Sequence, residues 1–221
     1  MATYLITGAN RGIGLEYCRQ LQARGELVVA ACRQPSPELE SLGVRLEAGL
    51  ELTSGEAIAG LVERLDGLPI DGLIHNAGIV ERTNLEHLDA GSLRRQFEVN
   101  AIAPLELTSA LLGQLHPGAK VILMTSRMGS IDDNTSGGSY GYRMSKVALC
   151  MAGKSMAIDL KPRGIAVALL HPGLVSTRMT GFSEQGITAE QAVTGLLARI
   201  DALSLETSGS FWHANGQLLP W

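Results

Sequence analysis

Two side chains in the segment from Tyr140 to Lys146 have the types and spacing for proton transfer. Tyr142 and Lys146 are four residues apart, so in a helix they lie on the same face. A free phenol has a pKa of about 10 and exchanges protons poorly at neutral pH, but a neighbouring ammonium group favours the phenolate and lowers that pKa. Tyr140 has Met144, not a lysine, at the same spacing. Tyr142 is therefore the candidate general acid or base.

A glycine-rich turn near the N-terminus has the residue types that bind phosphate groups. The short apolar run at 3–7 ends in Thr7-Gly8-Ala9-Asn10-Arg11-Gly12-Ile13-Gly14, and a helical pattern follows through Arg24. In a strand–turn–helix unit of this kind, backbone N–H groups approach a pyrophosphate and the helix dipole favours its charge. The glycine spacing differs from the common Gly-x-Gly-x-x-Gly fingerprint, so a turn that only closes tight strand–helix packing remains the alternative.

The residues after the second predicted strand, 27–31, indicate which dinucleotide binds. An acidic residue at this strand end accepts a hydrogen bond from the 2'-hydroxyl of NAD, but the chain reads Cys32-Arg33-Gln34. Arg33, together with Arg11 in the glycine turn, suits the oxygens of a 2'-phosphate. We therefore expect NADP(H) to be preferred over NAD(H), and two solvated surface arginines are the alternative.

Polar residues also follow the ends of later predicted strands. The strand at 70–75 leads into Asn76-Ala77-Gly78, and the strand at 121–124 leads into Thr125-Ser126. In open parallel sheets, ligands bind at this carboxyl edge. His75 has no second ligand at metal-binding spacing, so we interpret it as structural and predict no metal site.

The helical tract predicted at about 90–115 has Asn100 in its middle and Pro104 four residues later. A proline there removes a helical hydrogen bond, so we predict a local kink that frees backbone groups. Asn100 is then either a tolerated polar position or the site of an opened carbonyl that holds a water.

Strands and helices alternate along the whole chain. Further strands are predicted at 44–52, 165–170 and 210–213, and further helices at 57–65, 142–161 and 189–200. This alternation predicts an α/β fold, a doubly wound parallel sheet (Rossmann fold) of about seven strands with helices on both faces. A chain of 221 residues suits one domain, so we expect residues 1–221 to form a single NAD(P)-binding domain that also holds the catalytic residues.

The composition narrows the class of partner. The net charge is −4 and the isoelectric point about 5.7, which gives no basic footprint for nucleic acid or an anionic membrane. No apolar run reaches the roughly 18 residues that span a bilayer, and no leader pattern is visible. The three cysteines lack metal or redox spacing. We expect a cytoplasmic protein with buried, reduced thiols that acts on a small molecule.

Taken in order, these motifs resemble the short-chain dehydrogenase/reductase family from Thr7 to about Thr177. Thr7-Gly8-x-x-x-Gly12-x-Gly14 is similar to the family's cofactor turn, Asn76-Ala77-Gly78 to its strand-four motif and Tyr142-x-x-x-Lys146 to its catalytic core. The remaining family positions hold Asn100, Ser126 and Pro172-Gly173. The Ser126-Arg127-Met128-Gly129 segment and the Leu-Pro-Trp terminus further resemble the C-factor and sniffer-like carbonyl reductase branch.

The resemblance implies hydride transfer between NADPH and a carbonyl, either an aldehyde or a ketone, or the reverse oxidation of an alcohol. Tyr142 would act as general acid or base, while Lys146 would lower its pKa and bind the nicotinamide ribose. Ser126 would orient the carbonyl oxygen, and Asn100 would hold a water that relays protons to Lys146.

The same resemblance implies a set of cofactor-binding residues. At the glycine turn these are Gly8, Asn10, Arg11, Gly12, Ile13 and Gly14; on the adenosine side they are Arg33, Glu51, Leu52, Asn76, Ala77 and Gly78; the others are Tyr142, Lys146, Pro172, Gly173, Val175 and Thr177. Val175 and Thr177 would contact the nicotinamide carboxamide.

Departures from the family pattern concern two loops. The family's serine usually lies nearer to the tyrosine than Ser126 does to Tyr142, which indicates an insertion in the loop 132–139. Ser130 is the alternative serine, but Ser126 ends the strand and begins the Ser-x-x-Gly pattern, so we prefer it. The short span 177–188 indicates an open or shallow pocket, which favours a small substrate or loose selectivity.

The sequence is compatible with two functions and with two oligomeric states. An NADP(H)-binding regulatory or signalling protein with vestigial catalysis is the alternative function, although a sensor has no physical need for Ser126, Tyr142 and Lys146 together. The long helices could pair across a two-fold axis into a homodimer, and a monomer is equally compatible. The sequence names neither the substrate nor the physiological direction.

Overall fold

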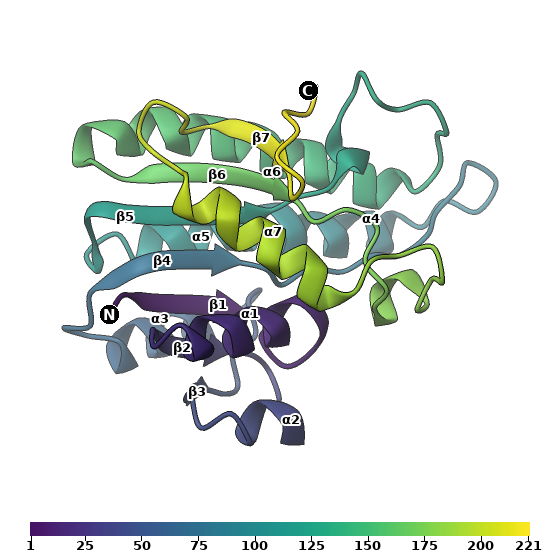
Figure 1. Cartoon of the computed structure of the whole chain (residues 1–221). Helices are drawn as coiled ribbons and strands as arrows, with labels where there is room; N and C mark the ends of the chain where they lie inside the picture. The colour runs from purple at the N-terminus through teal and green to yellow at the C-terminus, as the bar shows by residue number, and fades with distance from the viewer.

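Apolar runs of β-branched and aliphatic residues form one parallel sheet. The computed structural model describes residues 1–221. Seven strands lie in the order β3-β2-β1-β4-β5-β6-β7, and every neighbouring pair is parallel (Figure 1). The strands are β1 (Thr3–Thr7), β2 (Leu27–Ala31), β3 (Arg45–Glu47), β4 (Ile70–His75), β5 (Leu115–Met124), β6 (Ala166–His171) and β7 (Ser210–His213). The predicted α/β fold with a doubly wound Rossmann-type sheet is confirmed.

Helices cover both faces of the sheet, as its apolar strands require. The helices are α1 (Gly12–Ala23), α2 (Pro37–Glu40), α3 (Gly55–Arg64), α4 (Ala90–Phe97), α5 (Ala103–Ala110), α6 (Tyr140–Leu160) and α7 (Ala189–Asp201), with short 3-10 turns η2 (Arg127–Gly129), η3 (Lys161–Arg163) and η4 (Arg178–Thr180). α1 and α7 pack on one face around a cluster of 22 buried residues, and α3, α5 and α6 pack on the other around 28 (Figure 1). β2 and β6 are buried along almost their whole length because helices lie on both sides of them.

The predicted helical tract at 90–115 is divided into three parts. Between α4 and α5 lies a π-helix, η1 (Glu98–Ile102), which contains Asn100. Pro104, just beyond it, has no N–H to donate, so the hydrogen-bond ladder of the preceding turn is rearranged. The π-helix lies where the sequence predicts a local kink from Asn100 and Pro104. The predicted end of the tract is wrong, because Leu115 already begins β5.

The third and fifth strands differ in length from the prediction. β3 covers only a small part of the predicted 44–52, and the chain turns away soon after it at Gly49, where φ is 78°. β5 begins earlier than predicted, because Leu115 pairs with Ile70 of β4 ahead of an irregularity in the register. The other strands agree with the prediction to within one residue.

The carboxyl ends of the strands lie along one edge of the sheet, and the segments that follow them carry the candidate site. The glycine turn follows β1, Asn76 follows β4, Thr125 and Ser126 follow β5, and Pro172 follows β6. Residues far apart in the sequence therefore meet at this edge, where open parallel sheets bind their ligands.

Candidate active site

The turn after β1 brings backbone atoms of three segments into contact. Gly8 and Gly12 have positive φ values of 66° and 54°, which favour glycine. A Cβ atom on Gly8 would lie 2.8 Å from the Cα of Ala77, and one on Gly14 would lie 2.2 Å from the carbonyl oxygen of Gly8. Only residues without side chains fit Gly8 and Gly14, so the turn, the start of α1 and the end of β4 pack backbone to backbone.

The N-terminus of α1 fits a phosphate group. Arg11, at the N-cap position, makes no capping hydrogen bond with its side chain, and the first turn contains no acidic residue. The N–H groups of this turn and the positive end of the helix dipole are thus suited to an anion, and the glycines permit its close approach. Asn10 and Ile13 lie in the same turn and are partly exposed. These residues fit the pyrophosphate of a dinucleotide.

Arg33, just beyond β2, pairs with Glu51. The Nη1 atom of Arg33 is 3.5 Å from Oε2 of Glu51, and the two side chains are 69% and 44% exposed. Leu52, beside Glu51, is buried. The cation predicted to bind a 2'-phosphate therefore has a carboxylate partner. Because an exposed ion pair is weak, a phosphate can compete with Glu51 for the guanidinium group.

Asn76 and Ala77 tie the end of β4 to the glycine turn. Asn76 Nδ2 donates hydrogen bonds to the carbonyl oxygens of Thr7 and Gly8, at 3.1 and 3.2 Å. The N–H of Ala77 donates to the hydroxyl of Thr7 at 3.2 Å. These bonds bring the predicted adenosine-side residues beside the predicted phosphate turn.

Tyr142 and Ser126 meet at the carboxyl edge of β5, and both are buried. The Ser126 hydroxyl accepts a hydrogen bond from the N–H of Met128, at 3.2 Å, and so caps η2. Burial raises the pKa of Tyr142, while a hydrogen bond with Ser126 lowers it by a smaller amount. Tyr142 is therefore a protonated phenol at neutral pH.

Lys146 lies one helical turn after Tyr142 and is also buried. Its Nζ atom is 5.7 Å from the centre of the Tyr142 ring and donates a hydrogen bond to the carbonyl oxygen of Met124 at 2.8 Å. Burial lowers the pKa of Lys146 to about 8. The sequence predicts that this ammonium lowers the pKa of Tyr142, but in the structure burial dominates and that pKa is raised.

The side-chain amide of Asn100 is engaged by its neighbours. Its Oδ1 accepts from the N–H of Ile79 at 2.8 Å, and its Nδ2 donates to the Ile79 carbonyl at 2.9 Å and to the Ser145 hydroxyl at 3.0 Å. A Cβ on Gly78 would lie 3.1 Å from Asn100 Oδ1 and 3.6 Å from Lys146 Nζ, so these two groups converge above Gly78. Both amide hydrogens of Asn100 are used, so neither can bind a water.

Ser130, the alternative serine, is bonded elsewhere. It is buried, and its hydroxyl accepts a hydrogen bond from the N–H of Asp133 at 3.1 Å. The long loop that follows is also held by an ion pair between Arg127 and Asp133, at 2.5 Å. Of the two serines, only Ser126 lowers the pKa of Tyr142 through a hydrogen bond, which favours Ser126.

The segment after β6 faces the glycine turn. Pro172 and Gly173 follow β6 directly, and Gly173 has a positive φ of 87°. Val175 is buried. A Cβ on Gly12 would lie 3.5 Å from Cγ2 of Thr177, so the predicted nicotinamide-side segment lies against the predicted phosphate turn.

His75 and the cysteines have structural surroundings. His75 Nε2 is 2.8 Å from the hydroxyl of Thr108, and burial lowers the pKa of His75 to about 3, so the ring is neutral. The three cysteines are free and buried. No group of three or more His, Cys, Asp or Glu side chains is placed to hold a metal ion. None of the helices combines the length and the apolar character needed to cross a membrane.

Sequence reasoning missed three polar residues that hold the candidate groups in place: Thr83, Gln96 and Ser145. All three are buried. The Ser145 hydroxyl donates to the carbonyl oxygen of Tyr142 at 2.8 Å while it accepts from Asn100. The available signal is spacing, because Gln96 lies four residues before Asn100 and Ser145 directly precedes the lysine of the Tyr-x-x-x-Lys pattern.

The family model of the short chain dehydrogenases matches residues 2–187. The chain belongs to the short-chain dehydrogenase/reductase family. This dehydrogenase/reductase is 43% identical, over the full length of both chains, to 1-hydroxy-2-glutathionyl-2-methyl-3-butene dehydrogenase of Rhodococcus sp. (strain AD45). It is 46% identical to C-signal of Myxococcus xanthus over 156 residues, which are 69% of this chain and 93% of that protein.

Solved carbonyl reductases share the fold of this dehydrogenase/reductase over its whole length. Carbonyl reductase Sniffer of D. melanogaster matches with a TM-score of 0.93 and 30% identity, covering 100% of both chains. The NADPH-bound carbonyl reductase from chicken fatty liver matches with a TM-score of 0.91 and 32% identity, covering 100% of this chain and 99% of that one. The resemblance to the C-factor and sniffer-like branch is confirmed, and this short-chain dehydrogenase/reductase is an oxidoreductase enzyme.

Proposed function

We propose that this enzyme uses NADPH to reduce the carbonyl group of a small aldehyde or ketone to an alcohol. One observation carries the proposal: the phenol of Tyr142 is buried, protonated and in contact with Ser126, at the sheet edge that also holds the phosphate-fitting turn. A protonated phenol is the form that donates a proton, so this site supports the direction of reduction.

The side chains at the sheet edge have distinct proposed roles. Tyr142 donates its proton to the carbonyl oxygen, and the hydroxyl of Ser126 donates a hydrogen bond to the same oxygen as negative charge develops there. Lys146, 5.7 Å from the Tyr142 ring, offsets the charge of the resulting phenolate and binds the nicotinamide ribose. Since both amide hydrogens of Asn100 are used, a relay water would bind the rearranged backbone of η1. NADPH, when bound, supplies the hydride.

We propose NADP(H) as the preferred cofactor, bound by the single domain that residues 1–221 form. The NADPH-bound state of the chicken carbonyl reductase supports this choice. The turn from Gly8 to Gly14 would hold the pyrophosphate, and Arg33 with Arg11 would hold the 2'-phosphate. Dissociation constants of NADPH and NADH for the wild type and for Arg33→Ala test this assignment. Equal affinities for the two cofactors, or an unchanged NADPH affinity in Arg33→Ala, would contradict it.

To identify the substrate class, the enzyme must be assayed with a panel of carbonyl compounds. The name of the Rhodococcus relative describes a dehydrogenase for an alcohol that carries a glutathionyl group. We therefore include glutathione-conjugated aldehydes beside simple aldehydes, ketones and quinones. The short segment between Thr177 and Thr188 favours small or loosely selected substrates, so a strict requirement for a bulky substrate would contradict this part of the proposal.

Consumption of NADPH by the wild type, Tyr142→Phe and Tyr140→Phe tests the central assignment. Tyr142→Phe removes only the phenolic oxygen, and we expect kcat to fall by about 10²- to 10⁴-fold, the usual contribution of a general acid. Tyr140→Phe is the matched control, two residues away in the same helix, and should keep its activity. Tight NADPH binding without turnover on any substrate would instead support a regulatory or signalling protein with vestigial catalysis.

A homodimer would use the outer faces of α5 and α6. Leu105, Met151 and Ile158 on these helices are 47%, 68% and 66% exposed. Light scattering on the purified protein distinguishes a dimer from a monomer, and Met151→Glu with Ile158→Glu should dissociate a dimer formed through this face.

A further inference from the structure

Residues 79–83 follow β4 and lie outside any helix or strand. Every second residue of this segment bonds to a helix that carries, or adjoins, a candidate catalytic residue. Ile79 pairs with Asn100, Glu81 pairs with Gln96, and Thr83 bonds to the start of α6. We refer to residues 79–83 as the bridging segment. It is bonded both to the helix tract that contains Asn100 and to the helix that contains Tyr142.

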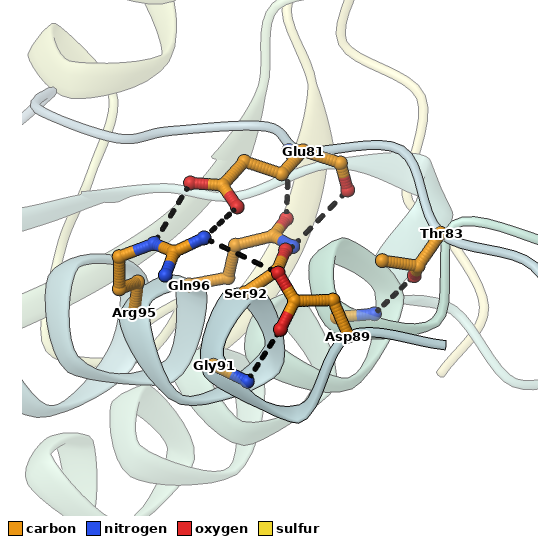
Figure 2. Close-up of polar contacts among 8 residues, drawn as sticks. Glu81, Thr83, Asp89, Gly91, Ser92, Arg95 and Gln96 are labelled. Carbon is orange, nitrogen blue, oxygen red and sulfur yellow. Dashed lines mark hydrogen bonds and ion pairs between the residues drawn. The ribbon is translucent and has the colours of Figure 1, made fainter. Parts of the chain in front are cut away.

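Gln96 repeats the pairing that Asn100 makes. Gln96 Oε1 accepts a hydrogen bond from the N–H of Glu81 at 3.1 Å, and Gln96 Nε2 donates to the Glu81 carbonyl at 3.1 Å (Figure 2). Asn100 exchanges the same two kinds of bond with Ile79. In an antiparallel sheet, alternate residues of a strand exchange both backbone bonds with their partners. The two side-chain amides thus replace a partner strand, and we call the two pairs the amide ladder.

Thr83 extends this pattern to the helix of Tyr142. Ser139, at the N-cap position of α6, makes no capping hydrogen bond with its side chain. The Thr83 carbonyl accepts from the N–H of Ser139 at 2.9 Å, and the Thr83 hydroxyl accepts from the N–H of Gly141 at 3.5 Å. The start of α6 is therefore capped by a distant part of the chain, directly before Tyr142.

Gln96 also packs directly against the start of α6. A Cβ on Gly141 would lie 2.4 Å from Gln96 Nε2, so the glycine between the two tyrosines permits the close approach of α6. Gln96 has no exposed surface, and its Nε2 also donates to the hydroxyl of Ser92 at 3.1 Å. With both amide hydrogens and the oxygen bonded, the side chain is held in one orientation.

We propose that Gln96 is a positioning residue for the reaction, which acts through the amide ladder and Thr83 to place Tyr142 relative to Asn100 and Ser126. This inference rests on the proposed function. Tyr142 and Asn100 belong to separate helices, and the bridging segment is bonded to both. A displacement of about 1 Å in a catalytic group can lower a rate about 100-fold, so small movements of the segment matter.

An exposed ion pair beside the ladder supplies a matched control. The Glu81 carboxylate accepts two hydrogen bonds from Arg95, at 3.2 and 2.8 Å, and Arg95 also lies 3.6 Å from Asp89 (Figure 2). The Arg95 and Glu81 side chains are 57% and 35% exposed, so the pair should contribute little. Arg95→Ala removes a contact with the same Glu81 but leaves the backbone bonds of the ladder intact.

The experiment compares Gln96→Leu with Arg95→Ala in steady-state kinetics, NADPH binding and urea unfolding. We expect kcat of Gln96→Leu to fall by about 10- to 100-fold, because the displaced phenol transfers its proton less effectively. NADPH affinity should fall by a much smaller factor than kcat, because the glycine turn, which would hold the pyrophosphate, is not touched. The alkaline limb of the kcat–pH profile should also shift, because the surroundings of Tyr142 and Lys146 change. Thr83→Val should lower kcat by a smaller factor, and Thr83→Ser, which keeps the hydroxyl, should restore it.

Two kinetic results would overturn the proposal. One is a folded Gln96→Leu variant with the kcat and pH profile of the wild type. The other is a fall in kcat that is matched by equal losses of NADPH affinity and stability, as for general destabilisation. If the wild type turns over no substrate, the proposed function fails, and amide hydrogen exchange decides on positioning. Faster exchange of the Gly141 and Tyr142 amides in Gln96→Leu than in Arg95→Ala supports the positioning role of Gln96. Equal exchange in the two variants overturns that role.

Discussion

Replacing Lys146 by methionine should change how the stability of the protein depends on pH. Burial lowers the pKa of Lys146 from 10.5 to about 8. One pKa unit corresponds to about 1.36 kcal/mol, so burial disfavours the charged form of this lysine by about 3 kcal/mol relative to the neutral form. Below pH 8 the lysine is charged in both the folded and the unfolded chain. Between pH 8 and pH 10.5 the unfolded chain binds one more proton, so the free energy of unfolding of the wild type rises with pH relative to Lys146→Met.

Urea unfolding followed by tryptophan fluorescence at a series of pH values measures this difference. Between pH 8 and pH 10.5, the free energy of unfolding of the wild type should rise by about 3 kcal/mol relative to that of Lys146→Met. The slope of this difference should be about 1.4 kcal/mol per pH unit. Other titrating groups cancel in the difference between the two proteins. Lys161→Met, at an exposed lysine just after α6, is the control and should show no such slope. A flat difference between wild type and Lys146→Met would refute the argument that Lys146 is desolvated.

Three further predictions follow from the geometry. Gly8→Ala should weaken NADPH binding and lower stability more than Gly25→Ala. Both glycines have positive φ, but only at Gly8 would an added Cβ lie against backbone, 2.8 Å from the Cα of Ala77. NADPH titration and urea unfolding of the two variants measure this difference. His75→Asn should lessen the loss of stability on acidification between pH 6.5 and about 3, since folding lowers the pKa of His75 across that range; acid unfolding curves measure the effect. Glu51→Gln should tighten binding of NADPH but not of NADH, because it frees Arg33 from its ion pair, and titration of both cofactors decides.

The features that the sequence predicts well depend on local patterns. β2 and β6 are apolar on both faces, so a run of five or six residues is enough to identify each strand. The turn from Gly8 to Gly14 is recognisable because close backbone packing requires glycine at particular positions. An interruption of regular helix near Asn100 is predictable because Pro104 removes a helical donor nearby, although its form, a π-helix, is not.

The features that the sequence does not predict join residues far apart in the chain. Thr83 caps α6 although α4, η1, α5, β5 and η2 lie between them in the sequence, and no periodicity marks Thr83. Arg33 is predicted as a free cation, but β2 and β3 run side by side, so the segments that follow them bring Arg33 to Glu51. The direction of the pKa shift of Tyr142 depends on burial, which the Tyr-x-x-x-Lys pattern alone does not reveal.

The alternation along the bridging segment separates two kinds of position. Ile79, Glu81 and Thr83 carry the bonds to the catalytic elements, whereas the intervening Val80 and Arg82 carry none of them. Substitutions at the intervening positions can therefore alter the surface of this segment while its attachment to the helices is retained. A laboratory search for variants with new substrate preferences would begin at Val80 and Arg82, where sequence can diversify without moving the proton donor.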